Sequence, residues 1–563
     1  MISNHRRDFL KLCLASLPFL AFPHRASGQG TTGSDQHRYR KPGALDRYID
    51  PLPVPKRLMR QGASTDGDEY FVRMLEFTHR LHSQLPPTKL WGYEGQYPGP
   101  TIEAMRGRPI AVQWENHLPS RHIFDVDAHI RGAALPAPAV RTVPHLHGAR
   151  NPSEYDGLPE SWFTSGQSAR YRYPNSQPAA TLWYHDHAAG ITRLNMYAGL
   201  SGFFLLRDEQ EQALNLPSGD YEIPLIIQDR RLDEKGQLVY APTFDDGQRP
   251  PPGLWGPQLF GDLPVVNGAI YPFLEVEPRP YRVRLLNGAN YRFFNLFLNL
   301  ASNPADLLSL VTFHQIGTDD GFLASPVAMN KILLGPAERA DLIVDFSGLE
   351  GRAVTLSNDA PAPFPGWNTV EPHHLTLYEL MQFRVTLPLA AKRSFSLPAL
   401  HPIAKLEETK SIRSRDFILA EGIDQRGRSV GLQINGKGYG DAVTEVVRLG
   451  STERWRFVNA TEDAHPIHLH MAQFQILQRQ GFNPVTLRNG TVELVGIPRQ
   501  PAAYEAGWKD TAVVNPREVL TLLVRFEGYA GRFVFESQLL EQADKGTMRP
   551  YLVAEGEANL QAQ

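Results

Sequence analysis

Polar and apolar residues alternate over short stretches of this chain, and turn residues separate the stretches. Such alternation is typical of strands that bury one face. Three stretches share one order, in which a glycine turn leads through alternating residues to an asparagine; they are 97–116, 266–287 and 434–459. Their last residues, Asn116, Asn287 and Asn459, are 171 and 172 residues apart. The pattern therefore predicts one β-rich domain present three times.

The predicted fold class is all-β, with Greek-key sandwiches or barrels as the repeated units. Among the 563 residues are 46 glycines and 46 prolines, and stretches with helical periodicity are few. This length suits about three to four domains of about 150 residues each. We predict domains over residues 45–210, 211–385 and 410–556, with a proline-containing linker over 386–409.

Residues 1–28 have the composition of an export signal. Arg6 and Arg7 precede an apolar run over residues 12–22, and small residues suited to cleavage follow at 26–28. Paired arginines in this setting are typical of a twin-arginine signal peptide. A membrane anchor is the alternative, but the run is shorter than the about 20 residues that span a bilayer. We therefore expect a periplasmic or secreted protein.

Charge and cysteine content narrow the classes of partner and site. The formal net charge of −3 gives no reason to expect a nucleic acid or an anionic membrane as partner. We expect no transmembrane segment after the leader. The only cysteine, Cys13, lies in the leader. The mature chain can therefore form no internal disulfide and offers no thiolate to a metal.

Three histidine clusters follow strand-like segments. They are His145-Leu146-His147, His185-Asp186-His187 and His465-Pro466-Ile467-His468-Leu469-His470. Residues i and i+2 of a strand lie on one side, so each His-X-His pair presents two imidazoles together. Imidazole binds copper, zinc, iron and nickel. A single pair is more often a hydrogen-bonded surface pair, but three clusters in a triplicated β chain indicate descent from a metal site.

Nearly the whole mature chain, from about residue 51 to residue 554, resembles the three-domain multicopper oxidases, especially the bacterial spore-coat laccase and bilirubin oxidase branch. Besides the histidine clusters, the matching segments are His147-Gly148, Trp183-Tyr184, Thr192-Arg193-Leu194-Asn195-Met196-Tyr197-Ala198-Gly199, Gly507-Trp508-Lys509-Asp510-Thr511 and Met548-Arg549-Pro550. The resemblance implies three cupredoxin-like Greek-key domains and copper as the cofactor.

In such oxidases a type 1 copper takes electrons from a reducing substrate, and a trinuclear copper cluster between the first and third domains reduces dioxygen to water. By resemblance, His145 and His468 would bind the type 2 copper. Four of the six type 3 ligands would be His147, His185, His187 and His470, and His465 would be one type 1 ligand. Asp156 matches an acid near the cluster that orients ligands or moves protons. An exposed loop carboxylate is the alternative for Asp156.

The last copper motif of the family is where this sequence departs from the resemblance. The family has His-Cys-His there, then a type 1 His five residues after the Cys and an axial Met ten after it. With the register fixed by the flanks 531–535 and 548–550, those positions hold Glu536, Ser537, Gln538, Gln542 and Thr547, and Ala543 replaces an acid that delivers protons. Blue copper needs the thiolate as its main soft ligand. We therefore predict that the type 1 site is lost.

The remaining six imidazoles are predicted to hold a partial copper site or another divalent metal. His465, Glu536 and Gln538 are further candidate ligands, and Asp156 and Glu536 are candidate catalytic residues. Two histidines with one carboxylate are an arrangement known for non-haem iron, and a mixed site of this kind also suits zinc. An empty polar pocket is the alternative.

Three functions remain open at this point. The first is a binding or scaffold protein that kept the fold and lost oxidase chemistry, for which the superfamily has a copper-free, exported cell-division protein as precedent. The second is an oxidoreductase that uses a remodelled metal cluster with dioxygen. The third is passive copper binding, against which the absence of a methionine-rich insert counts, since the chain has nine methionines in all. The substrate and any protein partner are not identified by the sequence.

Overall fold

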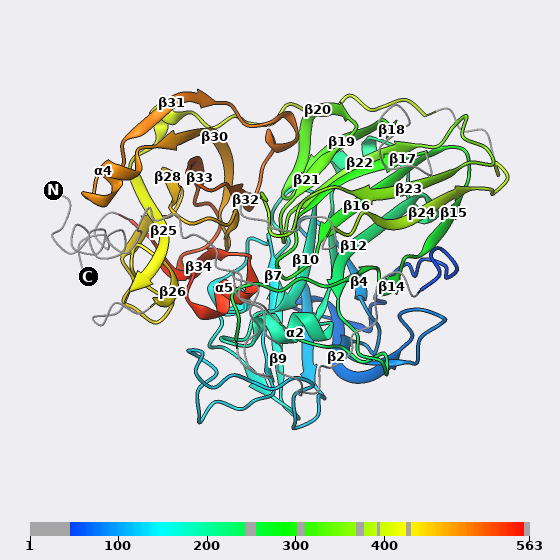
Figure 1. Cartoon of the computed structure of the whole chain (residues 1–563). Coiled ribbons are helices and arrows are strands. Elements are labelled where there is room, and N and C mark those ends of the chain that lie inside the picture. The colour runs from blue at the N-terminus through cyan, green and yellow to red at the C-terminus, as the bar shows by residue number, and fades with distance from the viewer. Residues whose placement is uncertain are drawn as a thin grey trace, which may run out of the picture.

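The computed structural model describes residues 45–241, 255–300, 310–366, 376–390, 395–423 and 429–556, which form mostly β-strands (Figure 1). The predicted all-β fold class is confirmed. The predicted export signal, residues 1–28, lies outside the described residues. No helix in the described part of the chain is long and apolar enough to cross a membrane.

Residues 62–207 form a first pair of sheets around a common core. One sheet contains β1 (Gly62–Ser64), β2 (Gly67–His79), β3 (Thr88–Tyr93), β5 (Ile110–Asn116) and β9 (Ser168–Tyr173); the other contains β4 (Gly99–Met105), β7 (Pro144–His147), β10 (Ala180–Asp186) and β11 (Ser201–Arg207). A small sheet joins β6 (Arg141–Thr142) and β8 (Phe163–Thr164). Tyr93, Trp114 and Tyr184 are buried in the shared core. Helix α2 (Thr192–Ala198) connects β10 to β11.

A second pair of sheets follows helix α3 (Glu209–Ala213). One sheet contains β12 (Glu222–Arg230), β13 (Leu263–Val266), β14 (Ala269–Ile270), β16 (Pro280–Asn287), β19 (Phe313–Thr318), β20 (Gly321–Met329) and β22 (Arg339–Asp345). The other contains β15 (Phe273–Val276), β17 (Phe294–Asn299), β18 (Leu310–Val311), β21 (Ile332–Leu334), β23 (Ala353–Asn358) and β24 (Glu379–Val385). Between β24 and β25, the described residues of the predicted linker form no strand or α-helix.

The third pair of sheets carries the C-terminal histidine cluster. One sheet contains β25 (Ser414–Ile423), β26 (Ser429–Ile434), β28 (Thr452–Asn459), β30 (Gln473–Phe482), β31 (Leu494–Arg499) and β33 (Glu518–Arg525). The other contains β27 (Glu445–Arg448), β29 (His465–Leu469), β32 (Thr511–Val514), β34 (Gly531–Ser537) and β35 (Met548–Ala554). Helices α4 (Pro484–Arg488) and α5 (Leu540–Lys545) complete this part. The domain boundaries given above stay a prediction.

Each large sheet contains one parallel pair of strands, and this feature repeats along the chain. The pairs are β2 with β5, β4 with β11, β12 with β16, β15 with β24, β25 with β28, and β27 with β35. A parallel pair cannot be joined by a tight hairpin, so each needs a crossover connection. This shared topology is typical of Greek-key units rather than of a simple meander.

The asparagines of the sequence repeat make the same contacts three times. Asn116, Asn287 and Asn459 end β5, β16 and β28, and all three are buried. In each case the side-chain oxygen accepts a hydrogen bond from the backbone N–H two residues later, at 2.9–3.0 Å. Each side-chain amide donates to two other segments, as Asn459 does to the carbonyls of residues 463 and 514. The residue recurs because it ties the end of one strand to the segments beside it.

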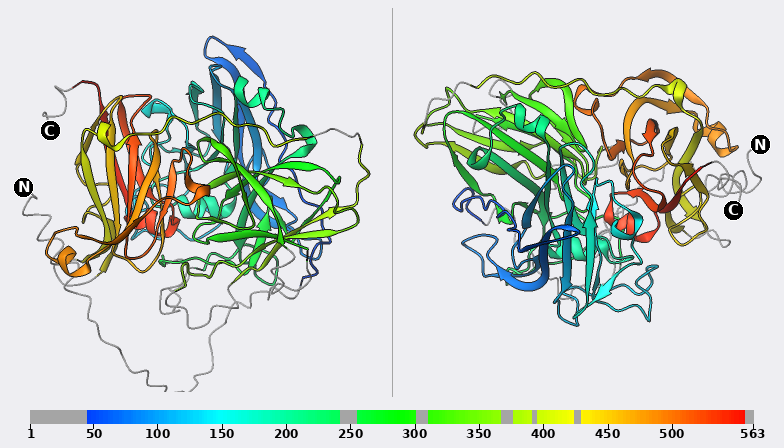
Figure 2. Two further views of the ribbon diagram at one scale, coloured as in Figure 1. Left: turned by 90° about the horizontal axis from the view of Figure 1, so that it is seen from above. Right: turned by 180° about the vertical axis from the view of Figure 1, so that it is seen from behind.

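The first and third pairs of sheets lie side by side, as the views of Figures 1 and 2 agree. At their junction α5 lies against α2. The buried carboxylate of Asp544 accepts hydrogen bonds from the backbone N–H groups of Thr192 and Arg193, and its ion pair with the Arg193 guanidinium is 3.0 Å long. This contact holds β34, which precedes α5, close to β10, which precedes α2.

Candidate metal centre

The six histidines expected to face a metal come from adjacent strands. In one sheet β7 pairs with β10, so that His145 is opposite His185. In the third pair of sheets, β29 pairs with β34, and His468 is opposite Glu536. His187 and His470 lie one residue beyond the ends of β10 and β29. All six side chains are buried: His145, His147, His185, His187, His468 and His470.

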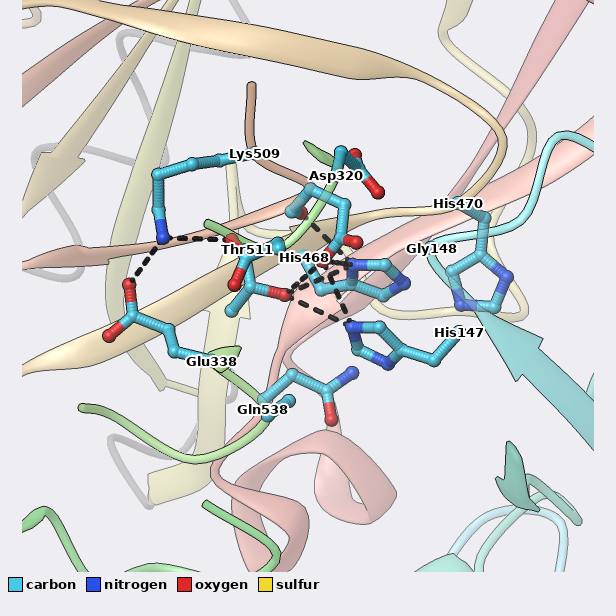
Figure 3. Close-up of polar contacts among 12 residues, drawn as sticks. His147, Gly148, Asp320, Glu338, His468, His470, Lys509, Thr511 and Gln538 are labelled. Carbon is cyan, nitrogen blue, oxygen red and sulfur yellow. Dashed lines mark hydrogen bonds and ion pairs between the residues drawn. The ribbon is translucent and has the colours of Figure 1, made fainter. Parts of the chain in front are cut away.

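Imidazoles from the two pairs of sheets stack on one another. The rings of His145 and His470 are 3.8 Å apart between centroids, and those of His147 and His468 are 3.5 Å apart. Figure 3 shows His147, His468 and His470 grouped in this way, with Gln538 beside them. The predicted juxtaposition of the first and last histidine clusters is therefore present in the structure.

The end of β10, between His185 and His187, is held in place by Asp186. Its carboxylate accepts hydrogen bonds from the backbone of Val143 at 2.9 Å and from the side chain of Asn195 at 2.7 Å. A second loop approaches closely at Gly157, where φ is +82° and a Cβ atom would lie 2.2 Å from the carbonyl oxygen of residue 144. Only glycine fits there, and the loop brings Asp156 against the imidazoles.

One nitrogen of each imidazole is fixed by a hydrogen bond to its surroundings. The Nδ1 atoms of His145, His185, His187 and His468 face the carbonyl oxygens of residues 156, 186, 157 and 510. Nδ1 of His470 is 2.8 Å from Asp156 Oδ2, and Nε2 of His147 is 3.1 Å from Asp510 Oδ1. Such contacts fix the ring orientation. Among the second nitrogens of the six rings, that of His187 is bonded to Glu536.

The other nitrogens face one another. The Nε2 atoms of His145, His468 and His470 have no hydrogen-bond partner within the described residues. His147 Nδ1 and His185 Nε2 are 3.3 Å apart. Leaving a buried polar atom unpaired costs about 1–3 kcal/mol. Three such atoms in one cluster are explained if a metal ion bonds to them.

Burial sets the charge of these groups. Burial lowers the pKa of His145, His147, His185 and His470 well below 6.5, so they stay neutral, which is the form that ligates a metal. Burial acts in the same direction on His187, but the neighbouring Glu536 carboxylate outweighs it and raises the pKa of this histidine. Burial also raises the pKa of Asp156 to about 8. Asp156 is fully buried, so it is no exposed loop carboxylate.

Glu536 and Gln538 lie within the cluster, as their register predicted. Glu536 Oε1 is 2.9 Å from His187 Nε2 and accepts a hydrogen bond from the Gln538 amide at 2.8 Å. Glu536 Oε2 has no partner within the described residues. Both side chains are buried. Glu536 is thus placed to serve as a ligand, and Gln538 to orient it.

At the position that corresponds to the type 1 copper, the side chains are hydrogen-bonded to one another. His465 Nδ1 is 3.0 Å from Ser537 Oγ, and His465 Nε2 is 2.9 Å from Thr461 Oγ1. The side-chain amide of Gln542 donates to the carbonyl of residue 257 at 3.0 Å. Both nitrogens of His465 are therefore satisfied without a metal, and the residues present do not fit a blue copper ion.

A pH-dependent cost is expected for replacing His465. Burial lowers its pKa to about 3, so below pH 6.5 the unfolded chain takes up a proton there that the folded chain does not. His465 therefore loses its stabilising contribution as the pH falls. We expect His465→Asn to lower the free energy of unfolding at pH 7.5. The difference in free energy of unfolding between wild type and variant is expected to shrink by about 2–3 kcal/mol between pH 6.5 and 4.5. Denaturant unfolding of both proteins across that pH range tests this expectation. A difference in free energy of unfolding that stays constant with pH would refute it.

For one group of residues at the site, the sequence predicted no function. Asp510 contacts His147 through its carboxylate and His468 through its carbonyl, and Thr511 Oγ1 lies 3.1 Å from His147 Nε2. Arg339, from β22 of the second pair of sheets, donates to both carboxylate oxygens of Asp510. Burial alone would raise the pKa of Asp510, but Arg339 outweighs it and holds it well below its usual range. The segment 507–511 was a recognisable motif, whereas nothing in the sequence pointed to Arg339.

Beside this group lies a buried lysine with two carboxylates. Lys509 Nζ is 2.8 Å from Asp319 and 3.2 Å from Glu338; Figure 3 shows the contact with Glu338. Burial alone would lower the pKa of Lys509, but the two acids raise it. These ion pairs bind the segment that carries Asp510 to the second pair of sheets.

Comparison with known proteins places this arrangement in a family. Multicopper oxidase family models match residues 77–138, 139–211 and 411–557. The chain is 41% identical over 522 residues to a laccase of Bacillus subtilis (strain 168), covering 90% of this chain and 98% of that protein. It is 33% identical over 555 residues to the multicopper oxidase LPR2 of Arabidopsis thaliana, covering 90% and 93%. The crystal structure of the McoA multicopper oxidase from Aquifex aeolicus is similar with a TM-score of 0.71, at 26% identity, over 90% of this chain and all of that one.

Proposed function

Because this chain belongs to the multicopper oxidase family, we propose that it is an exported, metal-binding member that has lost the type 1 copper site and two type 3 histidines and has no laccase activity. The family implies copper. The residues that would hold a metal are His145, His147, His185, His187, His468 and His470, with Glu536 beside them. The leader over residues 1–28 supports export by the twin-arginine route.

The observation that carries this proposal is a contrast between two groups of buried histidines. Around the trinuclear position, three Nε2 atoms have no partner within the described residues. At the type 1 position, both nitrogens of His465 are hydrogen-bonded to hydroxyl groups. The donors at the first place fit a metal, and those at the second do not. Selective loss of this kind supports a metal-binding protein without an electron-entry site.

A scaffold function and an oxidoreductase function make different predictions about the same residues. A scaffold protein would have no use for a metal, and its unpaired imidazoles would stay unsatisfied. An oxidoreductase that uses a remodelled His and Glu cluster with dioxygen is favoured by one observation, the placement of Glu536 against His187. Dioxygen consumption with a small reductant in place of a phenol would distinguish it from a binding protein. The relatives named as laccases do not decide the matter, because this chain has Ser537 where their chemistry requires a thiolate.

The copper-loaded protein is expected to show no intense thiolate-to-copper absorption and no oxidation of phenols or bilirubin. The physical reason is that Ser537 supplies no thiolate, which is the main soft ligand of a blue copper ion. An absorption spectrum after copper loading, with dioxygen uptake in the presence of a phenol, tests both parts. A relative that retains the cysteine, treated in parallel, is the positive control. A blue protein, or phenol-dependent uptake that survives removal of contaminating oxidases, would show the proposal to be wrong.

A further inference from the structure

Three buried side chains in the cluster form a ligand set that includes an oxygen. His187, His470 and Glu536 each offer one ligand atom, and these atoms lie within 4.8 Å of one another. We propose that they bind one divalent first-row cation as a two-histidine, one-carboxylate site, of the class that holds iron(II) or zinc(II). This proposal rests on the proposed function, because it assumes that the cluster binds metal, and it specifies which residues and which class of ion.

The candidate ligand atoms of the three side chains lie close together, and two of the side chains have a buried atom without a partner within the described residues. His470 Nε2 and Glu536 Oε2 have no hydrogen-bond partner within the described residues. His187 Nε2 lies 2.9 Å from Glu536 Oε1, a hydrogen-bond distance. His and carboxylate ligands bind zinc at about 2.0–2.2 Å, so the three atoms, now within 4.8 Å of one another, would move inward to meet one ion.

The surroundings of each ligand are also those of a metal site. Asp156 Oδ2 holds His470 Nδ1 at 2.8 Å, and the carbonyl oxygen of Gly157 holds His187 Nδ1 at 3.3 Å. The Gln538 amide donates to Glu536 at 2.8 Å. Metal-binding histidines characteristically bond through their other nitrogen to a carboxylate or carbonyl, and ligating carboxylates are themselves hydrogen-bonded. Each of the three side chains thus has the support that fixes a ligand.

The carboxylate determines which ions this site favours. A histidine at position 536 would be neutral, whereas Glu536 brings a negative charge and a hard oxygen ligand. Soft sulfur ligands select copper(I), while two histidines with one carboxylate suit iron(II) and also zinc(II). Within the described residues no cysteine appears among the candidate ligand groups. The oxygen ligand therefore makes this site better suited to a harder divalent ion than three histidines would be.

The test uses the full-length exported protein, stripped of metal with a chelator and titrated with cobalt(II) and with zinc(II). Cobalt(II) reports its coordination through its absorption spectrum. Glu536→Gln is expected to lower the affinity for the most tightly bound ion at least about 100-fold. Loss of a residue that only supports a ligand lowers metal affinity by up to about 100-fold, and loss of a ligand should cost at least as much. The matched control is Glu541→Gln, because Glu541 is equally buried but bonds to Tyr240 and Asn290 instead of the imidazoles. This control is expected to bind both ions as the wild type does.

A second variant keeps the proposal testable if Glu536→Gln fails to fold. Glu536→His replaces the oxygen ligand with a nitrogen, and we expect it to retain cobalt(II) with a changed absorption spectrum. Equal affinities and identical cobalt spectra in wild type, Glu536→Gln and Glu536→His would overturn the assignment of Glu536 and leave the proposed function standing. If wild type binds copper but neither cobalt(II) nor zinc(II), this proposal fails and the proposed function stands; if it binds none of the three ions, both fail.

Discussion

Replacing His145 and His468 together with alanine is expected to reduce, but not to abolish, the rise in melting temperature that a divalent metal produces in the wild type, because the group formed by His187, His470 and Glu536 is left intact. The two residues come from β7 and β29, and each has an Nε2 atom without a partner within the described residues. A metal that binds only the folded chain stabilises it by about 2.7 kcal/mol at one hundred times its dissociation constant. Removal of both imidazoles takes away the part of this contribution that depends on His145 and His468, where the first and third pairs of sheets meet.

The measurement compares melting temperatures with and without copper or zinc after the protein has been stripped. His465→Ala is the matched control, because His465 is also a buried histidine but has both nitrogens satisfied by hydroxyl groups. Both variants are expected to melt below the wild type without metal, since each leaves a cavity in a packed region. When metal is added, the control is expected to gain as much stability as the wild type does, and the double variant clearly less. If the wild type contains no metal after export and its melting is unchanged by added metal, the scaffold function is the correct one.

The sequence was most informative where a residue's role repeats along the chain. Asn116, Asn287 and Asn459 made the threefold repeat visible because each forms the same set of hydrogen bonds at a strand end. The His-X-His pairs predicted converging imidazoles because strand geometry places residues i and i+2 on one side. The register of the last motif likewise placed Glu536 and Gln538 at the cluster.

The sequence was less informative about contacts between segments that no pattern connects. Arg339 reaches Asp510 across 171 positions of sequence, and nothing near either residue indicates the pair. Similarly, the sequence predicted loss of the type 1 copper but not that Thr461, a loop residue, would satisfy the second nitrogen of His465. Such contacts depend on how whole sheets pack, and they were accessible only from the structure. Whether the six histidines bind metal stays a prediction.

Restoring the cysteine alone, by Ser537→Cys, is expected to restore neither the blue colour nor dioxygen reduction. The new thiol would face His465, whose other nitrogen stays bonded to Thr461. Gln542 and Thr547 supply neither a second imidazole nor a thioether. At the trinuclear position, Glu536 and Gln538 would still stand in place of two histidines. A buried cysteine in such surroundings behaves as a small apolar residue with a weak donor, rather than as a copper ligand.

We expect phenol-dependent dioxygen reduction only when all five positions are changed together. Ser537→Cys, Gln542→His and Thr547→Met supply the missing type 1 ligands, on which the blue absorption depends. Glu536→His and Gln538→His supply the two missing type 3 histidines, without which dioxygen reduction is expected to stay absent. Absorption spectra and phenol-dependent dioxygen uptake of the single variant, the fivefold variant and Ser537→Ala, which removes the hydroxyl without adding a thiol, measure this. A blue and active Ser537→Cys protein would mean that the remaining residues already form a type 1 site, contrary to the hydrogen bonds that now satisfy His465.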